Sequence, residues 1–168
     1  RFRQKLFVFK IHSRAFFTLG ERETMPLRDA LLLEFDDEMA KTRTSLARIP
    51  GDKLDWRPHP KSPVMAWLGG HLAQLPQWGV MTLTTRELDI LPGGTPPPRP
   101  EKPASVQMIL EVFDRNAAAA RAALAGASDE DLSAPWSLLM NGQTKFTLPR
   151  AGVWRSMVMN HVVHHRAQ

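Results

Sequence analysis

The chain has 168 residues, with 22 Lys/Arg against 17 Asp/Glu and no cysteine. This length suits one domain with its own hydrophobic core, and the lack of cysteine excludes a disulfide framework, a thiolate metal site and a cysteine nucleophile. Six basic residues lie within positions 1–24, so the remainder is nearly neutral, with 16 basic against 15 acidic residues. It lacks the clustered Lys/Arg of a nucleic-acid surface, and we expect a cytoplasmic protein that binds neither nucleic acid nor membrane.

Residues 1–24 differ from the rest of the chain. Their apolar runs are short and interrupted by charge, too short to span a bilayer, and they lack the unbroken apolar stretch of a signal peptide. Met25 then opens a regular helical pattern. We expect residues 1–24 to be a disordered leader, upstream sequence included through a misplaced start, with a flexible basic arm as the alternative. Residues 25–168 are the predicted domain.

The first two predicted helices are separated by a proline-rich loop. Apolar residues recur every three or four positions from Leu32 to Ile49 and again from Val64 to Thr82. Between them, Pro58, Pro60 and Pro63 cannot continue a helix. Ser62 is the predicted N-cap of the second helix, with Pro63 at its first position, and Pro76 is expected to bend this helix.

The second half of the chain predicts two more helices around a short insertion. Residues 89–103 are rich in proline and predict an extended crossover. Ser105 is the predicted N-cap of the third helix, and Asn141-Gly142 predicts a hairpin turn before a last helix that begins near Pro149. Four helices with one apolar stripe each predict an all-α four-helix bundle, with a long crossover between helices 2 and 3 and a small hairpin-like insertion before helix 4.

Three histidines fall on these apolar stripes. His71 lies in the middle of the second stripe, and His161 and His165 lie four residues apart on one face of the last helix. Unsatisfied imidazoles in an apolar interior cost about 1–3 kcal/mol each, whereas one divalent cation would satisfy all three. We therefore predict a metal site formed by His71, His161 and His165, and leave His164, about 100° away around the helix, outside it.

Each histidine also has a simpler interpretation when taken alone. His71 could be a core histidine bonded to a backbone carbonyl, and the other two could belong to a solvated helix end. Three protein ligands with open positions are typical of a catalytic metal site, because structural sites are closed by four ligands. The sequence lacks the glutamate of HExxH and shows no nucleophile elbow, P-loop or dinucleotide motif.

Two segments resemble one family. Residues 52–78 (DKLDWRPHPKSPVMAWLGGHLAQLPQW) and 153–168 (VWRSMVMNHVVHHRAQ) resemble the DinB-like superfamily of metal-dependent proteins, and the likeness extends over nearly everything from Met25 onward. The resemblance implies a four-helix bundle with a long crossover. It also implies a divalent metal, commonly zinc or nickel, on His71, His161 and His165. The last helix of such proteins continues for another turn or more, so we expect this helix to fray close to His165 unless further residues follow Gln168.

The resemblance further implies a function. Related members include thiol-dependent S-transferases and a thiol-dependent maleylpyruvate isomerase, which bind a low-molecular-weight thiol at the metal. We therefore expect a metal-dependent thiol transferase that takes a small thiol and an electrophile and forms a homodimer. Because the chain has no cysteine, the sulfur must come from a small molecule. The expected pocket walls are Trp67, Trp78 and Trp154.

Two other functions remain open at this point. One is a non-catalytic, dimeric metal-binding or stress-response bundle, and the other is a metal-dependent hydrolase that activates water at the same position. The residues identify neither a general base nor a thiol pocket that would separate them.

Overall fold

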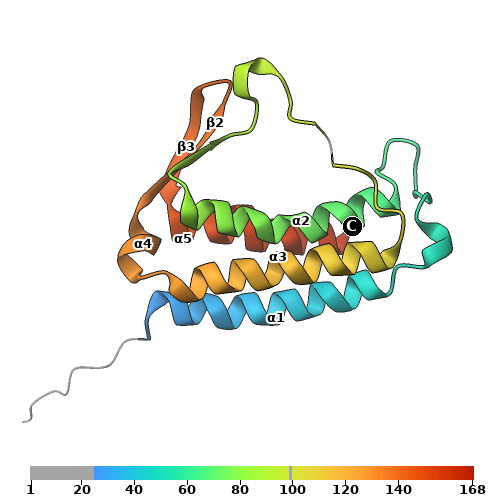
Figure 1. Cartoon of the computed structure of the whole chain (residues 1–168), viewed down its shortest axis with the longest axis horizontal. Coiled ribbons are helices and arrows are strands. Elements are labelled where there is room, and N and C mark those ends of the chain that lie inside the picture. The colour runs from blue at the N-terminus through green and yellow to red at the C-terminus, as the bar shows by residue number, and fades with distance from the viewer. Residues whose placement is uncertain (1–24, 99) are drawn as a thin grey trace, which may run out of the picture.

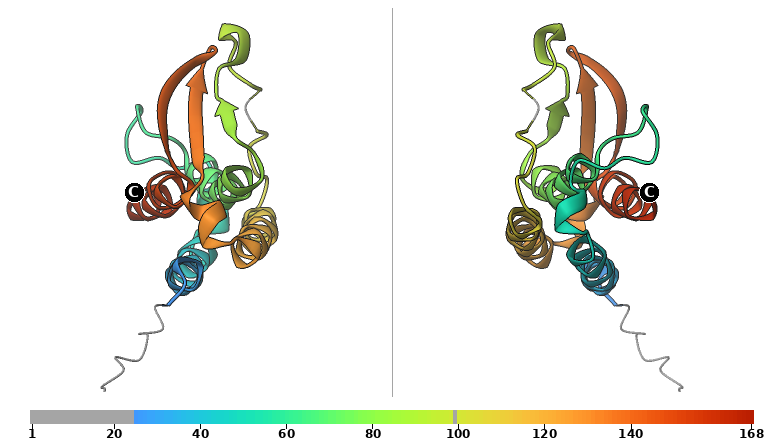
Figure 2. Two further views of the ribbon diagram at one scale, coloured as in Figure 1. Left: turned by 90° about the vertical axis from the view of Figure 1, so that its left-hand side faces the viewer. Right: turned by 90° about the vertical axis from the view of Figure 1, so that its right-hand side faces the viewer.

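Four long helices pack side by side in the computed structural model, which describes residues 25–98 and 100–168 (Figures 1 and 2). The leader predicted for residues 1–24 lies outside this range. The long helices are α1 (Leu27–Ala47), α2 (Met65–Thr84), α3 (Val106–Gly126) and a fourth made of α5 (Arg150–Val153), η3 (Trp154–Met159) and α6 (Asn160–Ala167). The predicted bundle is confirmed. None of the described helices is long and apolar enough to cross a membrane.

The long crossover determines how the helices are oriented. In Figure 1, α2 and α3 run in the same direction, while α1 and the fourth helix run the opposite way. Two consecutive helices can be parallel only if the chain returns along the bundle between them, and residues 85–105 make that return. The crossover also contains a short strand and the 3-10 turn η2 (Pro92–Gly94), neither of which its proline content predicts.

A small sheet rises from one end of the bundle (Figure 2). It has the strand order β1-β2-β3, with β1 parallel to β2 and β2 antiparallel to β3. The strands are β1 (Glu87–Asp89), β2 (Pro135–Met140) and β3 (Gln143–Pro149). The predicted hairpin is therefore confirmed, and the crossover strand β1 extends it to three strands.

One carboxylate joins the crossover to the hairpin turn. Asn141 and Gly142 both have positive φ, 53° and 73°, as expected for a two-residue turn. The carboxylate of Asp89 accepts hydrogen bonds from their amides at 3.0 and 2.7 Å, and from the amide of Leu91 at 2.9 Å. These bonds lower the pKa of Asp89.

Helix starts agree with prediction at α3 but not at α2. The hydroxyl of Ser105 accepts from the amide of Met108 at 3.1 Å, as an N-cap should. By contrast, α2 begins at Met65, so the N-cap predicted at Ser62 is wrong. Backbone bonds replace that cap, because the amides of Met65 and Ala66 donate to carbonyls of the preceding loop, each at 2.9 Å.

The core follows the predicted stripe on α1 but not on α2. On α1 the buried residues are Leu31, Phe35, Met39, Thr42 and Leu46. On α2 the buried face consists mostly of small residues: Ala66, Gly69, Leu72, Ala73, Leu75, Pro76, Gly79 and Thr82. Most of the stripe predicted there is only half-buried. The buried face of α2 was predicted from the hydrophobicity of its residues. The neighbouring helices instead pack against the face of α2 that carries its smallest side chains.

Helix α2 and the fourth helix pack closely at Gly79. Trp154 is fully buried and packs against Phe35, with ring centroids 5.3 Å apart. A methyl group at Gly79 would lie 2.7 Å from a ring carbon of Trp154. The absence of a side chain at Gly79 therefore lets the indole lie directly on α2.

The fourth helix contains a widened turn. Residues Trp154–Met159 form a π-helix, and the amide of Asn160 bonds to the carbonyl of Arg155, five residues earlier. This widening buries Val153 together with Val158, and Trp154 together with Met159, each pair five residues apart. Short π segments occur frequently at functional sites, and this one ends two residues before His161.

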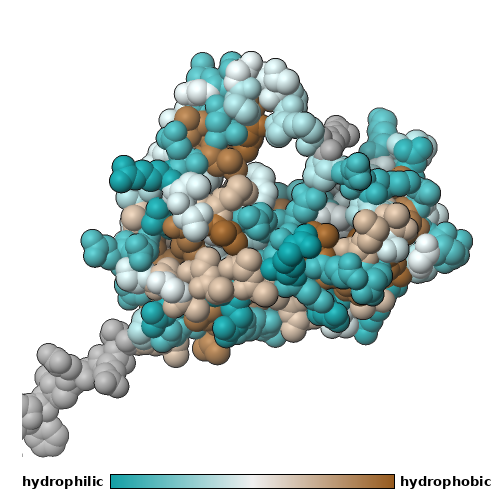
Figure 3. All heavy atoms as spheres, in the orientation of Figure 1, coloured by the Kyte–Doolittle hydropathy of each residue, from teal (hydrophilic) through white to brown (hydrophobic). Residues whose placement is uncertain are grey.

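One face of the molecule mixes polar and apolar side chains. Figure 3 shows hydrophilic residues over much of one face, with hydrophobic side chains gathered where the sheet meets the helices. A second apolar cluster of Trp136, Leu138 and Val153 lies there, with Trp78 packed against it. Its role is structural, since it attaches the sheet to the bundle.

We expect Gly79→Ala to destabilise the protein by about 1–3 kcal/mol, because the added methyl overpacks the Trp154 contact. Urea denaturation measures this change. The matched control is Gly126→Ala at the end of α3, where nothing lies within 4 Å of the added carbon. Equal stability of the two variants would contradict the close packing.

Candidate metal centre

Two helices bring three histidines together. His71 comes from α2, and His161 and His165 come from α6; each side chain is half-buried. One ring nitrogen of each can be chosen so that all three lie within 4.8 Å of one another. The Nε2 atoms of His71 and His161 are 3.5 Å apart. The structure thus assembles the three residues selected from the sequence, and this triad could bind a metal.

The donor set fits a divalent cation. Zinc–imidazole bonds of about 2.0–2.1 Å in a tetrahedral arrangement place two nitrogens about 3.3 Å apart, close to the observed 3.5 Å. The ring centroid of His165 lies 4.6 Å from the ring centroid of His71 and 4.7 Å from that of His161. No carboxylate or further histidine of the described residues belongs to this group, so the protein offers three ligands and leaves coordination positions open.

The environment favours neutral imidazoles. Burial, followed by the charges of His165 and His161, lowers the pKa of His71 from 6.5 to about 4. Burial also lowers the pKa of His161, together with the charge of His165, against the opposing effect of a hydrogen bond to the carbonyl of Met157. Metal ions bind the neutral ring, so both shifts prepare the site for a cation at neutral pH.

Neighbouring groups orient two of the rings. Nδ1 of His165 donates to Oε1 of Gln168 at 2.8 Å, which leaves Nε2 free as an acceptor. The indole of Trp67 stacks on the ring of His71, with centroids 5.2 Å apart and planes inclined by 12°. These contacts hold the rings without occupying the nitrogens that face one another.

A half-buried ion pair anchors the end of α6. Nη2 of Arg166 forms an ion pair with Oε2 of Glu38 on α1, with 2.6 Å between the two atoms. The pair does not have the geometry of a hydrogen bond. Nη1 donates to the Glu38 carbonyl and to the hydroxyl of Thr42, both at 3.1 Å. Because Arg166 follows His165 directly, these contacts also fix the backbone that carries His165.

The tryptophans expected to line a pocket lie in three different places. Trp67 is 41% exposed and stacks on His71. Trp78 packs against the cluster beneath the sheet, and Trp154 is fully buried in the core. Only Trp67 therefore lies beside the histidines, and the positions of Trp78 and Trp154 do not favour contact with a cofactor. His164 is exposed and outside the histidine group, as predicted.

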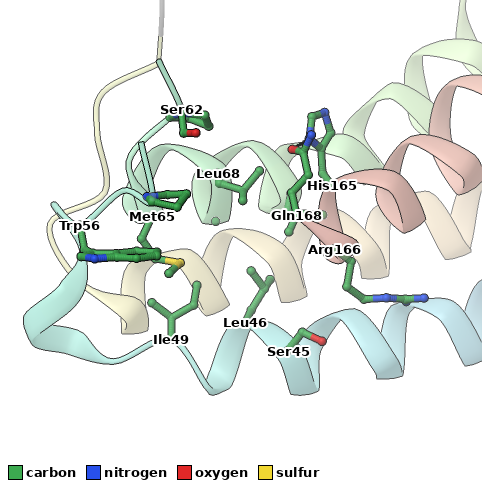
Figure 4. A pocket seen from close by; sticks show the side chains of 14 residues that line it. Ser45, Leu46, Ile49, Trp56, Ser62, Met65, Leu68, His165, Arg166 and Gln168 are labelled. Carbon is green, nitrogen blue, oxygen red and sulfur yellow. Dashed lines mark hydrogen bonds between the residues drawn. The ribbon is translucent and has the colours of Figure 1, made fainter. Parts of the chain in front are cut away.

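A pocket of about 440 Å³ opens beside His165 (Figure 4). It lies between the end of α1, the start of α2 and α6, and Trp56 and Met65 line its far end. Neither this pocket nor the Glu38–Arg166 pair could be predicted from the sequence. The pocket forms between the loop before α2 and side chains of different helices, and the ion pair joins α1 to α6, so neither has a characteristic spacing along the chain.

We expect the metal-free protein to lose stability as the pH falls from about 6.5 towards 4. The unfolded chain binds a proton at His71 near the ordinary pKa of 6.5, whereas the folded chain does so only near 4. Urea denaturation with a chelator present, repeated across this range, measures the loss. His71→Ala should flatten the dependence and His59→Ala, in the exposed loop, should not; identical profiles would show that His71 is not protected from protonation.

Comparison with known proteins agrees with this geometry. The DinB superfamily model matches residues 34–168, a range that contains the three histidines, the sheet and all but the first turns of the bundle. A search of curated proteins and a search of solved structures gave no match. Because the family model covers most of the chain, this protein belongs to the DinB superfamily.

Proposed function

We propose that this protein binds one divalent metal ion, zinc or nickel, through His71, His161 and His165, and transfers a low-molecular-weight thiol to an electrophile. The observation that carries the proposal is the convergence of three half-buried imidazoles from two helices beside an open pocket. Three protein ligands leave room for an exogenous ligand, as in catalytic sites. Family membership supports the same proposal.

The chemistry divides between the ion and the chain. A divalent cation held by the three histidines would lower the pKa of a coordinated thiol, so that a thiolate is available at neutral pH. The chain supplies three imidazole ligands, orients His165 through Gln168 and covers one face of His71 with Trp67. With no cysteine in the sequence, the sulfur that reacts comes from a small molecule.

The surroundings favour thiol transfer over hydrolysis. A hydrolase that activates water gains from a carboxylate or histidine that serves as general base. Glu38, the carboxylate that contacts α6, is already paired with Arg166. A thiolate is a strong nucleophile once its proton has left, so it has less need of such a base.

We expect the purified protein to bind about one zinc or nickel ion per chain, by the three-ligand argument. Replacing His71, His161 or His165 with Ala should weaken binding by more than about 100-fold, beyond the loss typical of an outer-shell change. Calorimetric titration measures the affinities. His164→Ala is the matched control and should remain within a few-fold of the parent; an equal loss there, or no metal bound by the parent, would refute the site.

The enzymatic step is tested by incubating the metal-loaded protein with several small thiols and a panel of electrophiles, and following the loss of free thiol. We expect a rate that depends on the added ion and falls at least tenfold in His161→Ala, because an activated thiolate needs the intact site. If thiols bind at the ion but are not consumed, the protein is a binding module. If ester or amide substrates are cleaved without thiol, hydrolysis replaces thiol transfer.

A further inference from the structure

The pocket beside His165 has a marked chemical character. Figure 4 shows Trp56 at one end, His165 and Gln168 at the other, and Leu46 and Ile49 along one wall. Leu68, Leu72, Met65 and prolines of the loop before α2 complete the lining. A volume of about 440 Å³ suits a small molecule. Most of its walls are aliphatic or aromatic, with Ser45, Ser62 and Gln168 as polar lining residues. His165, a candidate metal ligand, lies at one end.

The pocket offers no free charge to an anionic ligand. Arg166 is the one lining residue with a permanent charge, and its guanidinium is held by Glu38 and Thr42. In Figure 4 this guanidinium points away from the pocket along α1. A carboxylate or phosphate placed at the Trp56 end, away from His165, would lose hydration without gaining a cation. The charge pattern therefore selects an uncharged group.

The far end of the pocket favours a flat group. Trp56 is 51% exposed, so its indole can still bury apolar surface against a ligand. Met65 lies beside it in Figure 4, and thioethers and aromatic rings contact each other favourably. An aromatic ring between these two side chains would gain stacking as well as burial.

We propose that this pocket binds the uncharged, aromatic body of a substrate whose reactive end lies at His165. The proposal rests on the proposed function and adds the substrate class: a small, neutral aromatic compound. The pocket supplies affinity through burial, and its position beside His165 places one end of the compound at the histidine group. Selection between substrates follows from the lack of a free cation among the residues that line the end away from His165.

The test uses the full chain loaded with cobalt(II), whose absorption spectrum reports thiol ligation. Three thiols of similar acidity are titrated: 2-mercaptoethanol, benzyl mercaptan and 4-(mercaptomethyl)benzoate. We expect benzyl mercaptan to bind at least tenfold tighter than 2-mercaptoethanol, because burial of roughly 100 Å² of apolar surface corresponds to more than a factor of ten. The carboxylate analogue should lose most of that advantage.

Variants test whether the tighter binding of benzyl mercaptan depends on the pocket. Trp56→Ala should reduce the preference for benzyl mercaptan to about threefold or less, and Ser62→Trp, which fills the pocket, should have the same effect while 2-mercaptoethanol binds as before. Met108→Ala changes an exposed methionine on α3 outside the pocket and should leave the preference unchanged. Equal affinity of the parent for benzyl mercaptan and 2-mercaptoethanol would overturn the pocket assignment and leave the metal-bound thiol intact.

A metal-independent measurement separates the two proposals. Benzyl alcohol, which has no thiol, is titrated into the metal-free protein while the indole NMR signal of Trp56, assigned with Trp56→Phe, is followed. If no thiol alters the cobalt spectrum but benzyl alcohol shifts this signal, the proposed function fails and the pocket still takes neutral aromatic compounds. If benzyl alcohol causes no shift up to its solubility limit, the pocket assignment is wrong.

Discussion

The contact between Gly79 and Trp154 sets the geometry on which the histidine group depends. It brings α2 and the fourth helix as close as an indole and a bare backbone allow. These helices run in opposite directions (Figure 1). His71 lies eight residues before Gly79, and His161 lies seven residues after Trp154. Because the helices are antiparallel, both histidines are on the same side of the contact, about 12 Å and about 10 Å from it. The packing in mid-bundle thus determines whether the imidazoles can meet.

Once the helices are at this distance, the rotation of the fourth helix decides which side chains face α2. The π-helical turn adds a residue between Trp154 and His161, and its widened spacing buries Val158 and Met159 together. At the other end, Arg166 attaches α6 to Glu38 and Thr42 on α1. A helix fixed at both ends cannot turn its histidines outward without breaking one of these contacts, so their half-burial is imposed by the fold. Burial in turn lowers the pKa of His71 and His161, so these two converging rings are neutral at neutral pH.

The sequence predicted the histidine group better than it predicted the helix that carries His71. The group was recognisable because histidine is rare on an apolar face, and the four-residue spacing of His161 and His165 needs only a helix. The buried face of α2 was not recognisable in the sequence. Close packing favours Gly69, Ala73 and Gly79 there, and a search for large hydrophobic residues does not select these positions. Strand β1 is three residues long and exists through pairing with β2. The π turn has no pattern in sequence, since neighbouring side chains impose it.

The apolar surroundings that lower the pKa of His71 and His161 continue past His165 into the pocket. A pocket meant for a charged metabolite would use its arginine for recognition, but here the arginine is committed to Glu38 and supports the helix. The protein therefore combines a site able to hold a cation with walls that repel charge. Under the proposed function, the histidines and the pocket are two adjacent binding surfaces of different chemistry, one for a metal-bound sulfur and one for an uncharged aromatic body. A cysteine-free bundle of this size would then recognise its small molecules by burial at one surface and by coordination at the other.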